Sequence, residues 1–172
     1  MRIARILTVL LIFLTCFTIS AEAQRTKRPV PRPTPTPKPV INADVAAAKQ
    51  KVSNQLSNIN RFVDILGPIA QSIEATDKDA KTRRLSKAAI AANEANKQKV
   101  ITAIRNLRAG LVSLETEFRT KPILSKYFLQ IQGISNLAAQ SEDSALAGKF
   151  VASKDPLRTI AQKLTDTMAA MQ

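Results

Sequence analysis

A periodic apolar stripe between Thr82 and Phe118 constrains the fold of this chain more than any other feature. Its members are three or four residues apart, which is the spacing of one face of an α-helix. They are Leu85, Ala89, Ala92, Asn96, Val100, Ile104, Leu107, Leu111, Leu114 and Phe118. The segment has no proline and one glycine, Gly110, so it predicts a single helix, about 55 Å long at 1.5 Å per residue. A helix of this length cannot bury its apolar face alone, so neighbouring segments must pack against it.

The segment before the stripe predicts a second long helix, from about Ala43 to Leu66. Its apolar face carries Val45, Ala48, Val52, Leu56, Ile59, Phe62, Val63 and Leu66. Gly67-Pro68 is expected to break or kink this helix. Thr76 and Asp79 have the spacing of a capping box, which predicts that the central helix begins shortly after them.

Two more helical segments follow the central helix, which is expected to end at Lys121-Pro122. The first has an apolar face made by Leu124, Phe128, Ile131, Ile134, Leu137 and Ala138. The polar run 141–144 predicts a turn, and Leu146, Phe150 and Val151 a short further segment. Asp155-Pro156 predicts a helix start with Asp155 as the N-cap. The last apolar face comprises Leu157, Ile160, Ala161, Leu164, Met168 and Met171.

Four amphipathic helices joined mostly by short connections predict an all-α domain over residues 41–172. An elongated antiparallel bundle of about four helices buries all four apolar faces together. The composition agrees, because glycine is rare and 45% of the residues are hydrophobic, which is enough for a helical core. An elongated helical hairpin with a helical cap is the alternative architecture.

The first 23 residues have the three parts of a secretory signal peptide. Arg2 and Arg5 precede an apolar run from Ile6 to Ile19, and Ala21-Glu22-Ala23 fits the small-x-small cleavage rule. We therefore expect cleavage after Ala23 and export to the periplasm or beyond. An uncleaved anchor is the alternative, but the apolar run is about 14 residues, short of the roughly 20 that span a bilayer.

Residues 24–40 predict a proline-rich linker, disordered or in polyproline-II conformation. Proline occupies every second position from Pro29 to Pro39. The linker also carries five basic residues and no acidic one: Arg25, Lys27, Arg28, Arg32 and Lys38. These five are candidate contacts to an anionic polymer, although a linker with no ligand explains the same sequence.

The densest basic cluster in the helical part consists of Lys78, Lys81, Arg83, Arg84 and Lys87. Five cations within ten residues could hold phosphate or carboxylate groups, so this cluster is the candidate anion-contact site. A basic surface that only aids solubility is the alternative, because the whole chain has a formal net charge of +13.

The sequence offers little catalytic chemistry. It has no histidine, and its one cysteine, Cys16, lies in the expected signal peptide, where the preceding residues fit a lipid-attachment motif poorly. The mature chain therefore lacks the usual general base, histidine. It also lacks imidazole and thiolate ligands for a metal, and a thiolate nucleophile. The acids lie outside the apolar stripes and are explained by ion pairs at i, i+4. The expected pairs are Glu74–Lys78, Asp77–Lys81, Glu115–Arg119 and Glu117–Lys121. We predict no catalytic, cofactor or metal site.

These features predict an exported, non-enzymatic helical bundle that binds a protein or an anionic component of the cell envelope. A periplasmic chaperone or stress sensor is the main alternative, and an enzyme of unknown type is a weaker one. Export and the small number of aromatic residues argue against nucleic acid as the partner. The mature chain is expected to have no transmembrane span, and the helical faces could also close in a homodimer of hairpins.

Overall fold

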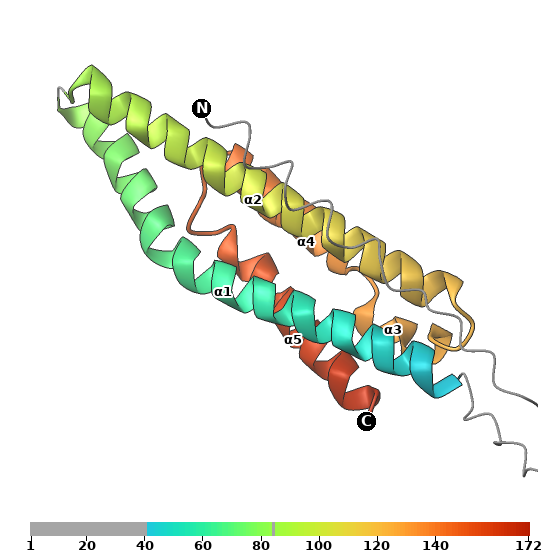
Figure 1. Cartoon of the computed structure of the whole chain (residues 1–172). Helices are drawn as coiled ribbons and strands as arrows, with labels where there is room; N and C mark the ends of the chain where they lie inside the picture. Colours follow the sequence, from blue (N-terminus) through green and yellow to red (C-terminus); the bar gives the residue numbers. More distant parts are fainter. Residues whose placement is uncertain (1–40, 84) are drawn as a thin grey trace, which may run out of the picture. The chain divides into compact units, whose positions relative to one another are not determined.

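Helices make up almost all of the chain that the computed structural model describes, which is residues 41–83 and 85–172 (Figure 1). Within these ranges four helices are longer than ten residues: α1 (Ile41–Thr82), α2 (Lys87–Thr120), α4 (Ile134–Leu146) and α5 (Lys154–Ala170). The 3-10 helix η1 (Ser125–Tyr127) and the one-turn helix α3 (Phe128–Ile131) join α2 to α4. The expected signal peptide, the proline-rich linker with its five cations, Cys16 and Arg84 lie outside the described residues.

The predicted antiparallel bundle is confirmed. Helix α1 packs against α2 and α5, and α4 packs against the same two helices, so the four form a closed ring of neighbours. Their inner faces meet in one apolar core whose largest fully buried side chains include Ile59, Ile104, Phe118, Ile134 and Leu157. No helix in the described ranges is both long enough and apolar enough to cross a membrane.

Helix α1 is longer than the sequence predicts. It continues through Gly67-Pro68 to Thr82, so the predicted kink remains compatible with the structure and the predicted break is wrong. Ala70 and Ile73, beyond the proline, are fully buried, and this packing offsets the lost backbone hydrogen bond. Figure 1 shows α1 changing direction part-way along, which is the usual effect of a proline inside a helix.

Helix α2 begins later than the sequence predicts. Thr76 is still inside α1, where its hydroxyl donates to the Ser72 carbonyl oxygen, so the proposed capping box does not start the central helix. The N-cap is Ser86, whose hydroxyl oxygen accepts a hydrogen bond from the Ala89 N–H at 3.1 Å. The helix ends at Thr120 with Lys121 as the C-cap, as predicted.

The apolar stripe of α2 is buried only from Val100 onward. Val100, Ile104, Leu111, Leu114 and Phe118 are buried, whereas Ala89, Ala92 and Asn96 are exposed. The early members are exposed because α4 and α5 do not extend over this part of α2, which packs there mainly against the end of α1 (Figure 1).

The predicted third helix is divided. Gly133, with φ of +88°, separates α3 from α4 because only glycine adopts this left-handed conformation without strain. The predicted turn at 141–144 is wrong, since these residues lie inside α4 and both Ser141 and Glu142 are buried. The Ser141 hydroxyl donates to the Ser153 carbonyl oxygen. This polar side chain therefore has a partner inside the bundle, and the segment stays helical.

Helix α5 begins one residue before Asp155. Its N-cap is Ser153, so the assignment of Asp155 as the N-cap is wrong, while Pro156 does lie in the first turn. Leu157, Ile160 and Leu164 are fully buried, as the last apolar stripe predicts, and Thr167 joins them.

Candidate anion-contact site

The end of the hairpin formed by α1 and α2 carries the basic cluster. We call residues 74–83 and 85–92 the hairpin tip, and none of them is buried. Figure 1 shows the tip, in green, extending past α4 and α5. Small side chains such as Ala80, Ala88 and Ala91 account for much of its sequence, so the two helices meet here without a wide apolar face.

The chain reverses direction at the tip within four residues. Thr82 ends α1, and its hydroxyl donates to the carbonyl oxygens of Lys78 and Asp79 at 3.2 and 3.4 Å. Ser86 then caps α2 from an extended backbone conformation. The Ser86 hydroxyl oxygen satisfies the Ala89 N–H, which the start of a helix leaves without a partner, and the Thr82 hydroxyl adds a local bond at the end of α1.

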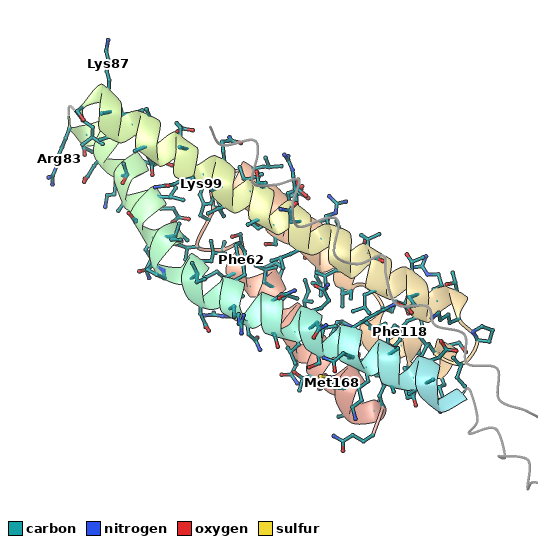
Figure 2. The ribbon with its side chains drawn as sticks, in the orientation of Figure 1. Phe62, Arg83, Lys87, Lys99, Phe118 and Met168 are labelled. Atoms are coloured by element: carbon teal, nitrogen blue, oxygen red, sulfur yellow. The ribbon has the colours of Figure 1, made fainter. Side chains whose placement is uncertain are left out.

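The cations of the cluster are distributed around this reversal instead of along one helix. Lys78 and Lys81 lie in the last turns of α1, Arg83 lies in the connection, and Lys87 is the first residue of α2. All four are exposed, and Figure 2 shows Arg83 and Lys87 pointing away from the ribbon in different directions. The structure therefore brings four of the five predicted residues to one end of the hairpin, and the fifth, Arg84, lies outside the described residues.

Most cations of the cluster form no close ion pair with the three acids of the tip, Glu74, Asp77 and Asp79. The Asp79 carboxylate lies 3.8 Å from the guanidinium of Arg83, which is a long ion pair, and the Arg83 side chain remains 76% exposed. Among the ion pairs of the described residues, none includes Lys78, Lys81 or Lys87. A weak, exposed pair contributes little, so the four described cations remain accessible to an anionic partner, while the three acids reduce the net charge of the described tip residues to +1.

Two predicted ion pairs at the tip are replaced by contacts between elements. Glu74 does not pair with Lys78 but accepts a hydrogen bond from the Val151 N–H at 2.8 Å. Asp77 does not pair with Lys81 but accepts one from the side-chain amide of Asn93 at 2.8 Å. Both carboxylates turn toward partners on other elements because those groups hold them better than an exposed lysine does.

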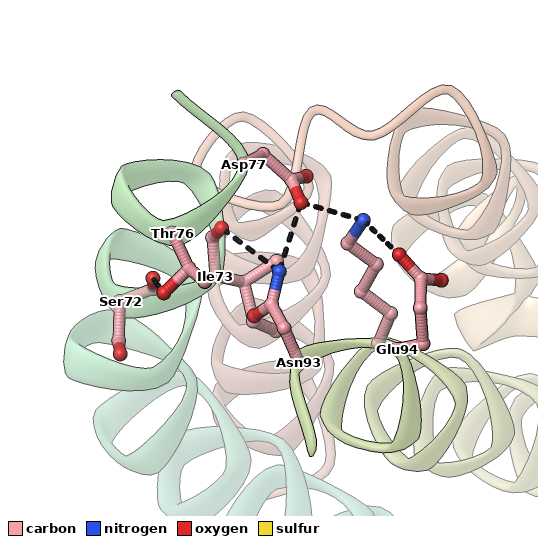
Figure 3. Close-up of polar contacts among 7 residues, drawn as sticks. Ser72, Ile73, Thr76, Asp77, Asn93 and Glu94 are labelled. Atoms are coloured by element: carbon pink, nitrogen blue, oxygen red, sulfur yellow. Dashed lines mark hydrogen bonds and ion pairs between the residues drawn. The ribbon is translucent and has the colours of Figure 1, made fainter. Parts of the chain in front are cut away.

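A polar network at the base of the tip joins α1 to α2 (Figure 3). The Asn93 amide, buried at 7% exposure, donates to Asp77 and to the Ile73 carbonyl oxygen. The Lys97 ammonium lies 2.7 Å from both Asp77 and Glu94. Burial alone would lower the pKa of Lys97, but hydrogen bonds to Asp77 and Glu94 and the attraction of both charges raise it above its usual value. The network therefore holds the tip with Asp77 directed inward.

Two buried carboxylates contradict the expectation that the acids lie outside the apolar stripes. Glu115 accepts hydrogen bonds from the N–H groups of Gly133 and Ser135 at 2.8 and 3.0 Å and from the Ser135 hydroxyl at 2.6 Å. It therefore caps the N-terminus of α4. Glu142 on α4 pairs with Arg105 and Arg108 of α2, the latter at 3.0 Å. Both carboxylates join α2 to α4.

The environments of these carboxylates lower both pKa values. Burial of Glu115 works in the opposite direction, but the hydrogen bonds from Gly133 and Ser135 outweigh it. For Glu142, the hydrogen bond from Arg105 is the largest cause of the lowered pKa. Together with the contact to Arg108, it outweighs the opposing effect of burial. A carboxylate held in its charged form is a structural anchor and a poor proton donor near neutral pH.

The remaining predicted pairs form. Glu115 lies 3.6 Å from Arg119, and Glu117 lies 2.8 Å from Lys121 and 2.7 Å from Lys51. No group of three or more histidine, cysteine or acidic side chains that could hold a metal ion occurs in residues 41–83 and 85–172.

Comparisons with protein-family models, with curated proteins and with solved structures gave no match to this chain.

Proposed function

We propose that this protein is an exported, non-enzymatic binding module whose hairpin tip contacts an anionic component of the cell envelope. The observation that carries the proposal is the exposure of Lys78, Lys81, Arg83 and Lys87 at one end of α1 and α2. The signal-like first 23 residues and the absence of histidine from the sequence support export and a non-enzymatic role.

The geometry favours phosphate or carboxylate groups displayed on a surface or polymer over a small ligand in a pocket. Arg83 and Lys87 point away from the ribbon in different directions, so they do not enclose one small anion (Figure 2). They can make several separate contacts to repeated charges, each strengthened by the positive potential of its neighbours. Such binding weakens as salt screens the charges.

The test is a salt titration of binding to anionic phospholipid vesicles, lipopolysaccharide and cell-wall polymer, using residues 24–172. The variant Lys81→Glu/Arg83→Glu/Lys87→Glu should lose binding by about tenfold or more, because each reversal replaces an attraction with a repulsion. The matched control is Lys49→Glu/Lys126→Glu/Lys149→Glu, which changes net charge equally at positions outside the hairpin tip and should retain most of the affinity.

The same titration on residues 41–172 separates the tip from the proline-rich segment. Binding by both lengths, steep in salt and sensitive to the tip variant, supports the proposal. If the tip variant and its control lose the same binding affinity, only net charge matters. The hairpin tip would then not be the contact site.

A further inference from the structure

A groove between α1 and α2 is lined only by residues of these two helices. Its apolar part is made by Phe62 and Ile65 of α1 and by Ala103 and Leu107 of α2. Figure 2 shows Phe62 between the two ribbons. We call this feature the open groove, and it is distinct from the hairpin tip.

Large apolar side chains in the open groove and beside it are exposed. Ile65 is 59% exposed and Ile69, one turn further along α1, is 36% exposed. Phe62, Ile65 and Ile69 follow a three- and four-residue spacing, so they form one stripe along the helix. A partner that covered Ile65 and Ile69 would remove apolar surface from water, which favours binding.

The charges beside this stripe are positive. Arg61 is the only charged residue among those lining the apolar part, and Lys99 lies one turn before Ala103 on α2. Both are exposed, and neither takes part in an ion pair among the described residues. The polar side chains that accompany them are amides, Gln55, Asn58 and Asn106. The surface therefore combines an apolar stripe, two cations and several neutral hydrogen-bonding groups.

The size of the open groove suits a helix. On α1 the groove extends from Gln55, whose side chain lies against Gly110 and closes one end, to Ile65. This part of α1 is about 15 Å long at 1.5 Å per residue. A partner helix of about three turns spans this distance, and the small residue Ala103 lets its backbone approach α2.

The charges decide between two occupants. A second copy of this chain would bring Arg61 and Lys99 against the same cations, and like charges oppose such a dimer. An acidic amphipathic helix would place apolar residues on Phe62 and Ile65 while its carboxylates meet Arg61 and Lys99. We propose that the open groove binds an acidic amphipathic helix of a partner protein.

The experiment measures fluorescence anisotropy of labelled helical peptides, about sixteen residues long, mixed with residues 24–172. One peptide has leucine at positions i, i+3, i+4 and i+7 with glutamate at the remaining helical surface positions. A second peptide replaces each glutamate with lysine, and a third scrambles the acidic peptide. The acidic peptide should bind at least about tenfold more tightly than the other two. Because it could also contact the hairpin tip, each titration is repeated in the Lys81→Glu/Arg83→Glu/Lys87→Glu variant, where groove binding should persist.

Variants of the groove locate the binding. Ile65→Ser should weaken binding of the acidic peptide by about tenfold, as expected for the loss of one buried aliphatic contact. Val112→Ser is the matched control, because Val112 is 43% exposed on α2 and lines a different hollow, with Arg105 and Arg108. Arg61→Glu/Lys99→Glu should reverse the preference toward the lysine peptide.

Three outcomes would overturn the proposal. The first is equal binding of the acidic and basic peptides. The second is acidic binding that Ile65→Ser leaves unchanged, and the third is acidic binding that disappears in the tip variant. Sedimentation equilibrium is run in parallel, and self-association that Ile65→Ser abolishes would assign the groove to a second copy instead. None of these outcomes depends on whether the hairpin tip binds anionic envelope material.

Discussion

At the scale of single residues, the polar side chains that connect helices matter more for this fold than the surface ion pairs. Glu115 shows why, because its side chain is only 5% exposed and its carboxylate receives three hydrogen bonds at the start of α4. A charge removed from water in this way is stable only while its partners remain in place.

We predict that Glu115→Gln destabilises the bundle by about 1–3 kcal/mol, the usual range when a buried hydrogen-bonded group loses its match. The amide that replaces the carboxylate brings a donor toward the Gly133 and Ser135 N–H groups, which are donors themselves. Urea unfolding followed by circular dichroism measures the change. Glu94→Gln is the control, since Glu94 is exposed and its pair with Lys97 should contribute under about 1 kcal/mol. Equal effects of the two substitutions would contradict the structural role assigned to Glu115.

The sequence contains part of this information. Glu115 lies four residues after Leu111 and three before Phe118, so helical periodicity alone places it beside the buried face. Its partners Gly133 and Ser135 could not be predicted, because they come from a segment eighteen to twenty residues away. The same limit applies to Asp77, because local spacing predicts a pair with Lys81 and does not reveal the competing partner on another helix.

At the scale of elements, the sequence predicts which segments are helical better than where they begin and end. The long stripe correctly predicts α2, and Lys121-Pro122 correctly predicts its end. Prediction fails where tertiary packing overrides a local signal. Pro68 lies inside α1 because buried residues on both sides hold the helix together, and residues 141–144 stay helical because Ser141 and Glu142 have partners across the bundle.

We predict that Ser86→Ala costs about 1 kcal/mol of stability, as expected for loss of an N-cap side chain. The bond from the Ala89 N–H to the Ser86 hydroxyl disappears, and the first turn of α2 should fray. Hydrogen exchange of the Ala89 and Ile90 amides would locate the effect at the hairpin tip.

The control for this substitution is Ser57→Ala, at an exposed position in the interior of α1. It should be neutral or slightly stabilising, because alanine has the higher helix propensity. A destabilisation equal to that of Ser86→Ala would show that the Ser86 side chain does not act as a cap.

At the scale of the whole bundle, the two candidate surfaces follow from the unequal lengths of the helices. Helices α4 and α5 are much shorter than α1 and α2, so the long pair continues beyond them and forms the hairpin tip. The open groove arises because α1 and α2 pack against α4 and α5 on their inner faces only. The basic cluster was predictable from sequence, whereas the groove was not, since it needs residues about forty positions apart to lie side by side.

The charged groups of the bundle also predict how its stability depends on pH. The folded pKa values of Glu115, Glu117 and Glu142 are lowered, so their contributions are present above the unfolded value near 4.3 and are lost as pH falls through the folded values. The pKa values of Lys97 and Lys121 are raised, so their contributions are present below the unfolded value near 10.4 and are lost as pH rises through the folded values.

We therefore predict a stability plateau from about pH 5 to about pH 9.5, bounded by an acid loss and an alkaline loss. The sequence has no histidine to titrate within this range. Urea unfolding of residues 24–172 at each pH from about 2.5 to 11 measures the profile. Glu142→Gln should reduce the acid loss, because the group that Arg105 and Arg108 hold ionised no longer takes up a proton on unfolding. A cooperative change in stability near pH 6 to 7, or an acid limb that Glu142→Gln leaves unaltered, would contradict the role given to these carboxylates.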